Sequence, residues 1–353
     1  MTLYCVLTNN FTMPEMYQCP SRMKKHWIER PFVGAYFFVS GTILIIIYLP
    51  CFIAMIRSKC RAPSFQLMIL LGIFDLLSLS VNSLITGVFD IMGASFCHYP
   101  LFVFVAGSVG LGSWMAGCLI CILLAVDRCV EISVNFPLAF LFHKNVFRVV
   151  ITGIILYWIY ACFFTKPLLF AAKYSSWFFD PNNGQEPNLY HNIPHTINNL
   201  IVSASSTPLY VYLCYHLIFK FGYSTSMWLY RSKQQIIIQA VVLCSFHAVA
   251  AYIYVYMQFF KSPSWLIMIG QLAWQWSNGT VCLTYWTLNR TIRNAAIRMM
   301  LSMKMRHKFG LHIGIDEQIA AERLGITKQM ENGENVRVFL IFGNTKVVPF
   351  LGD

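Results

Sequence analysis

Leu101–Val126 reads LFVFVAGSVGLGSWMAGCLICILLAV and contains no Lys, Arg, Asp or Glu. A helix of about 20 apolar residues is long enough to cross the hydrocarbon core of a bilayer. Runs of similar character lie on both sides of it: Phe32–Ile56, Phe65–Met92, Val149–Phe170, Leu200–Phe219, Ile236–Phe260 and Trp265–Leu288. In lipid, a helix satisfies every backbone group within its own segment. The sequence therefore predicts an all-α protein, a bundle of seven transmembrane helices.

The composition agrees with a membrane protein. The chain has 353 residues, of which 57% are hydrophobic and 11% are charged, whereas a soluble domain carries about 25% charged residues. We expect four regions: an extracellular segment (1–31), the membrane domain (32–288), a basic amphipathic juxtamembrane helix (289–308) and a cytosolic tail (309–353).

The net charge of +12 could indicate nucleic-acid binding, but the positions of the basic residues argue against it. They concentrate after the first, third, fifth and seventh runs, as expected for segments on the cytosolic side. The N-terminal segment is an exception, with Arg22, Lys24, Lys25 and Arg30. The total still predicts a multi-pass protein in the lipid bilayer with its N-terminus outside and its C-terminus in the cytosol.

The sequence suggests two covalent modifications on the extracellular side, a glycan and a disulfide. Asn10-Phe11-Thr12 is a sequon for N-glycosylation. Cys97 precedes the third run, and an oxidising exterior would allow it to form a disulfide with Cys19 or with Cys5.

Polar residues recur at helical spacing inside two of the runs. Asp75, Ser78, Asn82 and Thr86 share one face of the second run. On the seventh run the same spacing relates Gln271, Gln275, Asn278, Cys282, Tyr285 and Asn289. Asp75 and Asn278 lie at similar depth, so we expect them to meet directly or through water. Asp75, Asn82, Asn278 and Tyr285 are candidates for an intramembrane polar switch; the alternative is a seam that only holds two helices together.

Arg128 shares a face of the third run with Trp114, Cys118, Cys121 and Ala125, which directs it into the cytosolic mouth. With its neighbour Asp127 it is a candidate for a residue that couples the bundle to a cytosolic partner, which the resemblance described below implies to be a G protein. The alternative is one more basic residue on the cytosolic side.

Aromatic and amide residues gather in the outer halves of the runs, as in small-molecule pockets between helices. The ligand-binding candidates are Phe104, Ser108, Tyr252, Tyr256, Gln271, Trp274 and Gln275. Gln258 and Trp177-Phe178-Phe179-Asp180 belong to the same group, although any of these aromatics could equally serve packing or the membrane interface.

The sequence offers no enzymatic chemistry. It lacks a metal-binding cluster, paired catalytic carboxylates, a phosphate-binding loop and a nucleophile elbow, so we expect neither an enzyme nor a cofactor. A retinal protein would need a lysine in the seventh run, and Lys261 precedes that run.

Short motifs along residues 19 to 300 resemble one family. They are Arg30-Pro31, Leu49-Pro50-Cys51, Leu71-Gly72-Ile73-Phe74-Asp75, Asn82-Ser83, Thr86-Gly87, Phe96-Cys97-His98-Tyr99-Pro100, Trp114, Phe164-Thr165-Lys166-Pro167, Trp177-Phe178-Phe179-Asp180-Pro181, Asn198-Asn199, Tyr254-Val255-Tyr256-Met257-Gln258-Phe259-Phe260 and Leu288-Asn289-Arg290-Thr291-Ile292-Arg293. Together they are similar to the nematode serpentine chemoreceptors of class T (Srt), which are heptahelical G-protein-coupled receptors. The family usually has Asn-Arg where this chain has Asp127-Arg128, and tends to carry a proline where this chain has Val281.

The resemblance implies a chemosensory receptor that binds a small-molecule or odorant ligand and signals through a heterotrimeric G protein, in the plasma membrane of sensory neuron cilia. One alternative is a seven-span ligand-gated cation channel of the insect odorant-receptor type, which would place the N-terminus in the cytosol. Another is a receptor-like scaffold or trafficking partner without signalling of its own.

Overall fold

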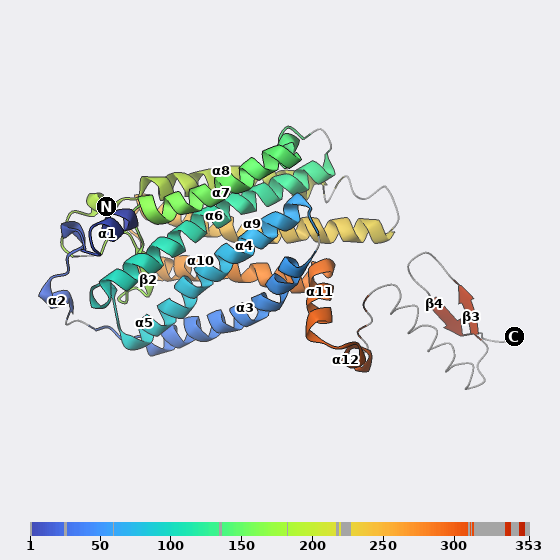
Figure 1. Ribbon diagram of the computed structural model, residues 1–353, viewed down its shortest axis with the longest axis horizontal. Helices are drawn as coiled ribbons and strands as arrows, with labels where there is room; N and C mark the ends of the chain where they lie inside the picture. Colours follow the sequence, from blue (N-terminus) through green and yellow to red (C-terminus); the bar gives the residue numbers. More distant parts are fainter. Residues whose placement is uncertain are drawn as a thin grey trace.

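Long helical segments lie side by side and form the body of the molecule (Figure 1). The structure is a computed structural model that describes residues 2–24, 27–58, 60–133, 136–181, 183–216, 219, 227–309, 311, 313, 336–339 and 346–349. The bundle consists of α3 (Pro31–Arg57), α4 (Pro63–Leu79) with its continuations η2 (Ser80–Ile85) and α5 (Thr86–Met92), α6 (Pro100–Ile132), α7 (Lys144–Phe164), α8 (Ile193–Tyr215), α9 (Met227–Phe259) and α10 (Ser264–Thr287).

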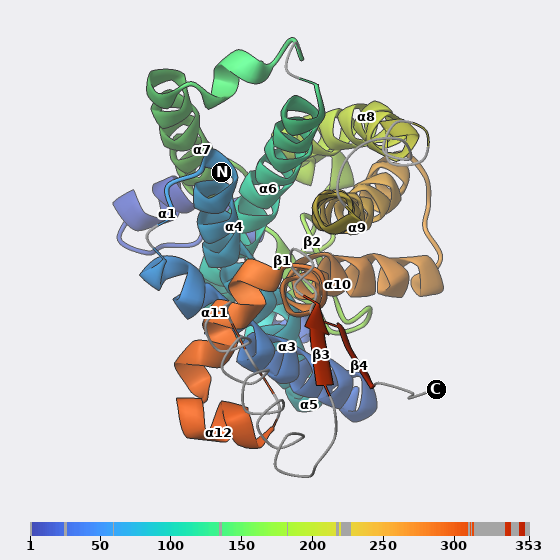
Figure 2. The ribbon, with the colours of Figure 1, turned by 90° about the vertical axis from the view of Figure 1, so that its right-hand side faces the viewer.

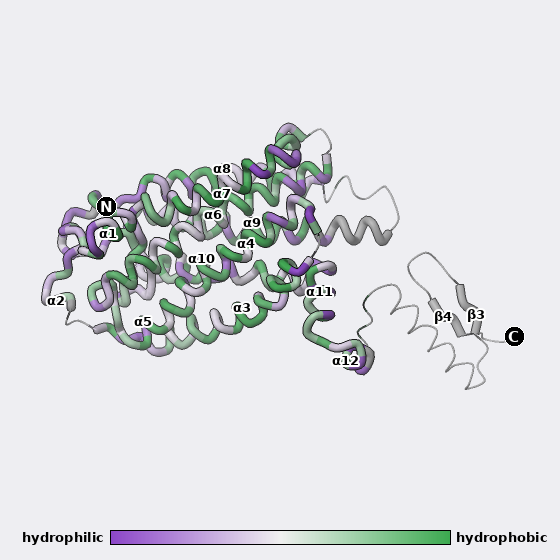
Figure 3. Tube along the Cα trace, in the orientation of Figure 1, coloured by the Kyte–Doolittle hydropathy of each residue, from purple (hydrophilic) through white to green (hydrophobic). Residues whose placement is uncertain are grey.

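Within the described residues, five segments are long and apolar enough to cross a membrane, as judged by length and composition: Pro31–Arg57, Pro63–Met92, Pro100–Ile132, Lys144–Phe164 and Ile237–Phe259. The two other bundle helices, α8 and α10, have 23 and 24 residues. They carry buried amide side chains, including Asn198, Asn199, Gln271 and Gln275, which lower their mean hydropathy. Figure 3 shows the hydrophobic residues along the bundle and hydrophilic ones gathered mostly toward its ends.

The apolar stretch Leu101–Val126 lies within α6, which forms the centre of the bundle. Seen end-on, α6 lies among α4, α7, α8 and α9 (Figure 2). In the most apolar stretch of α6, 83% of the residues are buried, compared with 22% in that of α7. Its many small residues, such as Gly107 and Gly112, let neighbouring backbones approach closely.

One expected boundary is corrected by a proline. The fourth run was expected to continue to Phe170, but α7 ends at Phe164, because Pro167 disfavours helix at the residue before it. The chain then forms a short antiparallel hairpin of β1 (Leu169–Ala171) and β2 (Ser176–Phe178), with Leu169 opposite Phe178. The fold is therefore mostly helical and not entirely so.

The hairpin and the N-terminal segment cover one end of the bundle, which we call the outer end. The Trp177 indole donates to Thr86 Oγ1 at 2.8 Å. The N-terminal segment contains α1 (Leu3–Thr8), η1 (Glu15–Tyr17) and α2 (Ser21–Lys24). A disulfide joins Cys19 to Cys97, while Cys5 is free and exposed. The ring of Tyr17 is fully buried and packs edge-on against Phe104.

The second transmembrane segment is not a regular α-helix. Its middle, η2, is a π-helical turn, a feature frequent at functional sites. The Thr86 hydroxyl donates to the Val81 carbonyl five residues earlier, at 3.1 Å. Asn82 and Ser83 in this turn are fully buried among the helices.

At the opposite, inner end the chain continues into α11 (Arg290–Met300) and α12 (Met303–Lys308). The expected single helix over 289–308 is thus divided at Leu301 and Ser302. Ile292 and Ala296 of α11 are buried, and α11 packs against α3. The remaining elements are η3 (Phe96–His98), η4 (Ala139–Phe142), η5 (Pro187–Tyr190) and a tail hairpin of β3 (Val336–Phe339) and β4 (Lys346–Pro349).

Gly107 tests the packing of α6 against the hairpin. A Cβ atom at Gly107 would overlap the carbonyl oxygen of Leu168. We expect Gly107→Ala to destabilise the protein by about 1–3 kcal/mol, the usual effect of overpacking, measured as a lower melting temperature of the detergent-purified protein. Gly153→Ala is the matched control, since a Cβ there meets no heavy atom within 4 Å. Equal melting temperatures for both variants and the wild type would contradict this packing.

Candidate functional site

The described residues form a cavity of about 410 Å³ at the outer end of the bundle. Its walls come from α6, the β2 hairpin strand with the segment after it, and the outer ends of α8, α9 and α10. They are mainly aromatic and apolar, and include Trp114, Leu168, Trp177, Phe179, Tyr254, Met257, Ile267 and Trp274. A cavity of this size and character suits a small organic molecule.

Of the predicted ligand-binding residues, Trp274 lines this cavity, and so do Gln258 and Trp177-Phe178-Phe179-Asp180 of the same group. Phe104 is buried under Tyr17, and the Ser108 hydroxyl donates to the Phe104 carbonyl. Gln271 donates to the Asn82 carbonyl at 3.0 Å, and Gln275 donates to the Ser83 hydroxyl, also at 3.0 Å. These donor groups hold the helices together and lie outside the walls of the outer cavity.

Tyr252 and Tyr256 require a correction. Their side chains are 47% and 45% exposed on the outside of α9. Tyr252 donates to the Ser203 carbonyl on α8, and Tyr256 stacks on Phe260. Tyr254, between them, faces inward and lines the cavity. Tyrosines alternate along this stretch, so their spacing alone does not indicate which face of the helix points inward.

The sequence analysis missed His195 and Tyr190 as cavity residues. Asn192 caps the start of α8, and its side chain accepts from the His195 backbone N–H at 3.0 Å. One turn later Asn199 contacts the His195 ring. The pair His195 and Asn199, four residues apart at the start of an apolar run, is the signal that could have been used. Burial raises the pKa of the Tyr190 phenol, so that side chain stays neutral.

The two polar seams face each other, but not through the expected pair. Asp75 accepts a hydrogen bond from the Tyr48 hydroxyl at 2.7 Å, and Tyr285 packs edge-on against Tyr48. Asn82 and Asn278 both donate to the Trp274 carbonyl, at 3.3 and 2.7 Å. No hydrogen bond joins Asp75 to Asn278 in the part of the chain that the structure describes, which corrects the expected direct contact.

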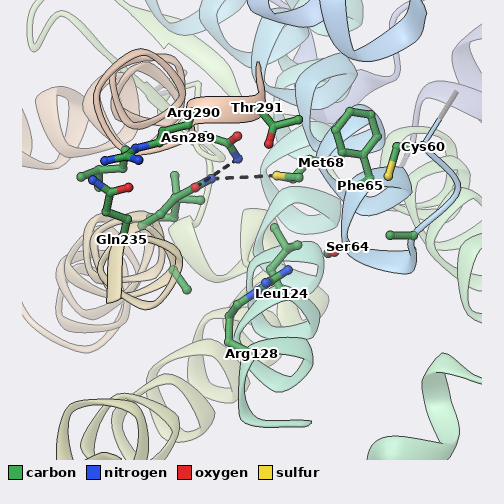
Figure 4. Close-up of a pocket in the computed structure, with 15 residues that line it drawn as sticks. Cys60, Ser64, Phe65, Met68, Leu124, Arg128, Gln235, Asn289, Arg290 and Thr291 are labelled. Carbon is green, nitrogen blue, oxygen red and sulfur yellow. Dashed lines mark hydrogen bonds between the residues drawn. The ribbon is translucent and has the colours of Figure 1, made fainter. Parts of the chain in front are cut away.

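A second cavity, of about 260 Å³, opens at the inner end (Figure 4). Arg128 and Leu124 of α6 line one side, and Gln235 of α9 and Asn289 line the other. Arg128 is held by Asp127, at 2.7 Å, and by Glu131. Both acids lie on α6 itself, so neither ties Arg128 to another helix.

An amide contact crosses the inner cavity, from Gln239 of α9 to Asn289, which follows α10. Asn289 donates to Gln239 Oε1 at 3.3 Å, and Gln239 donates to the Met68 sulfur at 3.9 Å. Asn289 also caps α11, because its side chain accepts from the Ile292 backbone N–H. Among the residues that can be described, no group of three or more His, Cys, Asp or Glu side chains is placed to hold a metal ion.

Comparison with known proteins agrees with this architecture. The family model described as "Serpentine type 7TM GPCR chemoreceptor Srt" matches residues 1–309. The chain is also similar to "Serpentine receptor class T-55" of Caenorhabditis elegans, with 22% identity over 292 residues, covering 80% of each protein. The match extends over all the helices of the bundle and both cavities. The chain belongs to the Srt family of serpentine seven-transmembrane chemoreceptors.

Proposed function

We propose that this receptor binds a small-molecule ligand in the outer cavity and activates a heterotrimeric G protein at the inner cavity. The observation that carries the proposal is that a single buried helix, α6, contributes Trp114 to one cavity and Arg128 to the other. A ligand shifts such a receptor only by its difference in affinity between two states. In this proposal the receptor acts in the plasma membrane of a sensory cilium.

Chemistry at the two ends supports the proposed orientation. Disulfides persist in oxidising compartments and are rare in the cytosol, so the bond between Cys19 and Cys97 favours an extracellular N-terminus. The basic face of α11, including Arg290 and Arg298, suits the anionic cytosolic leaflet. A channel of the insect odorant-receptor type would place the disulfide in the reducing cytosol.

Asn10 provides a direct test of this orientation. Its side chain is exposed in a turn, as is Thr12 of the same sequon. We expect Asn10 to be glycosylated in cells, so that the wild type, but not Asn10→Gln, gains mobility on a gel after endoglycosidase treatment. Asn289→Gln, in a second sequon at the inner end, should behave as the wild type. A glycan on Asn289 would show that the inner end is extracellular, which is the reverse of the proposed topology.

Arg128 is our candidate for G-protein contact. It lines the inner cavity with 11% of its side chain exposed, and its two partners lie on its own helix. Movement of α9 would therefore widen the cavity without first breaking an ion pair to Arg128. A widened cavity would present the guanidinium and its apolar neighbours to the G protein.

We expect Arg128→Ala to lower odorant-evoked signalling by at least about tenfold, within the usual range of coupling free energies. The measurement is the calcium response of cells expressing the receptor to an odorant panel, with surface delivery checked by antibody. Arg148→Ala is the control, because Arg148 is exposed on α7 outside the inner cavity. An unchanged response in Arg128→Ala would remove the coupling role and favour another docking residue.

We further propose that Asp75, Asn82, Asn278 and Tyr285 form the intramembrane switch. Buried ionisable groups in a membrane are costly, and this acid is fully buried with one hydrogen-bonded oxygen. The carbonyl of Trp274 accepts from Asn82 and Asn278 while its indole lines the outer cavity. A ligand that displaces this indole would therefore disturb the seam.

For the switch, we expect Asp75→Ala to reach the cell surface but to lose the odorant response, because the Tyr48 hydroxyl loses its acceptor. The same calcium assay measures it. Ser78→Ala is the matched control: Ser78 is equally buried on the same face, and its hydroxyl has no acceptor among the described residues. Normal signalling by Asp75→Ala would reduce the seam to helix packing.

A further inference from the structure

A chain of hydrogen bonds behind the outer cavity fixes the orientation of one amide. The indole N–H of Trp114 can only donate, and it donates to Asn199 Oδ1 at 3.1 Å. Asn198 Nδ2 donates to the same oxygen at 3.3 Å. Two donors on one atom identify it as the amide oxygen. The Asn199 NH₂ group must then face His195 Nε2, which lies 3.0 Å away.

This amide sets the tautomer of His195. An NH₂ group only donates, so His195 Nε2 must accept, and the ring is neutral with its proton on Nδ1. That Nδ1–H is buried and has no acceptor in the part of the chain that the structure describes. His195 itself is 5% exposed and lines the outer cavity.

Trp274 presents a second donor of the same kind. It is 2% exposed, lines the same cavity from α10, and its indole N–H also lacks an acceptor among the described residues. Two other donors in the wall are engaged: Trp177 donates to Thr86, and Tyr254 donates to the Gly270 carbonyl. A buried donor left unpaired is costly, so these two N–H groups favour a ligand that can accept.

The remaining wall indicates a ligand without charge. Leu168, Phe179 and Met257 give apolar surface, and His195 is neutral. The charged residues that line the cavity are Asp180, which is half-buried, and Lys261, which is solvent-exposed. A charged group bound directly against His195 and Trp274 would lose its hydration and gain no counter-ion from either of them, and Asp180 lies on the segment after β2.

We propose that the outer cavity recognises an uncharged, mainly apolar molecule with one hydrogen-bond-accepting atom, such as a ketone or an ester, through the Nδ1–H of His195 and the Nε1–H of Trp274. This rests on the proposed function only in placing the ligand in the outer cavity. It adds which chemical group the receptor reads and which two atoms read it.

The test uses the purified full chain in detergent, with binding followed by quenching of tryptophan fluorescence. The probes are C6–C10 methyl ketones and the corresponding 2-methyl-1-alkenes, in which =CH₂ replaces the carbonyl oxygen. Alkylamines and alkanoates of equal length supply a charge. We expect a ketone to bind at least about tenfold more tightly than its alkene, and the charged probes to bind more weakly still.

His195→Phe and Trp274→Phe should each reduce the preference for ketone over alkene, while His195→Gln, which keeps a donor, should retain part of it. Trp177→Phe is the matched control: it alters the same wall, but the Trp177 N–H is already used. It should change ketone and alkene affinity equally. Comparison of ratios keeps the test valid for a variant of reduced stability.

Equal affinity for ketone and alkene in the wild type would overturn the proposal, as would tighter binding of a charged probe or no binding of any probe. A failure of this proposal can be distinguished from a failure of the proposed function. If the ketones fail but another odorant evokes signalling that Arg128→Ala abolishes, the receptor stands and the ligand class is wrong. If the ketones bind as expected but never evoke G-protein signalling, the ligand class stands without the receptor.

Discussion

Polar side chains between helices find no water in a lipid bilayer, so each needs a partner on a neighbouring helix. Gln275 of α10 meets this need by donating to Ser40 on α3 and Ser83 in η2. Asn82 reaches from η2 to the carbonyl of Trp274. Such bonds each stabilise helix association by about 0.6–2 kcal/mol. Because they join distant parts of the chain, they determine which faces of α3, α10 and η2 meet.

The same constraint explains what distinguishes the two cavities. At the inner end Arg128 has its two carboxylates on α6, and Gln239 has Asn289 and Met68. These two polar groups of the inner cavity therefore have hydrogen-bond partners within the protein. At the outer end His195 and Trp274 each keep an unpaired donor in an aromatic wall. The outer cavity is therefore suited to a ligand of complementary polarity, and the inner one to a partner that competes for contacts already made.

Hydropathy was enough to predict the helices, because crossing a membrane requires a length and a polarity that few other structures share. It was not enough for their ends: Phe170 is as apolar as the helix before it, and only Pro167 signals that the helix has stopped. It was harder to predict which face of each helix points into the bundle. Tyr252, Tyr254 and Tyr256 look alike in sequence, and tertiary packing turns only Tyr254 inward. The positions three and four residues from Tyr48, the partner of Asp75, are Leu44, Ile45, Cys51 and Phe52, so no polar spacing pointed to it.

The two cavities are also connected by α10. This helix runs from Ser264 to Thr287 without an internal proline, and Val281 is fully buried. Sharp kinks in helices almost always need proline or a comparable break. In the proposed mechanism, a displacement of Trp274 would be carried along α10 by tilt or rotation of the helix. Asn289 follows directly after α10 and holds Gln239 of α9, so such a movement reaches the contact that bridges the inner cavity. In that mechanism the contact between Asn289 and Gln239 would couple the outer cavity to the inner one without a proline kink in α10.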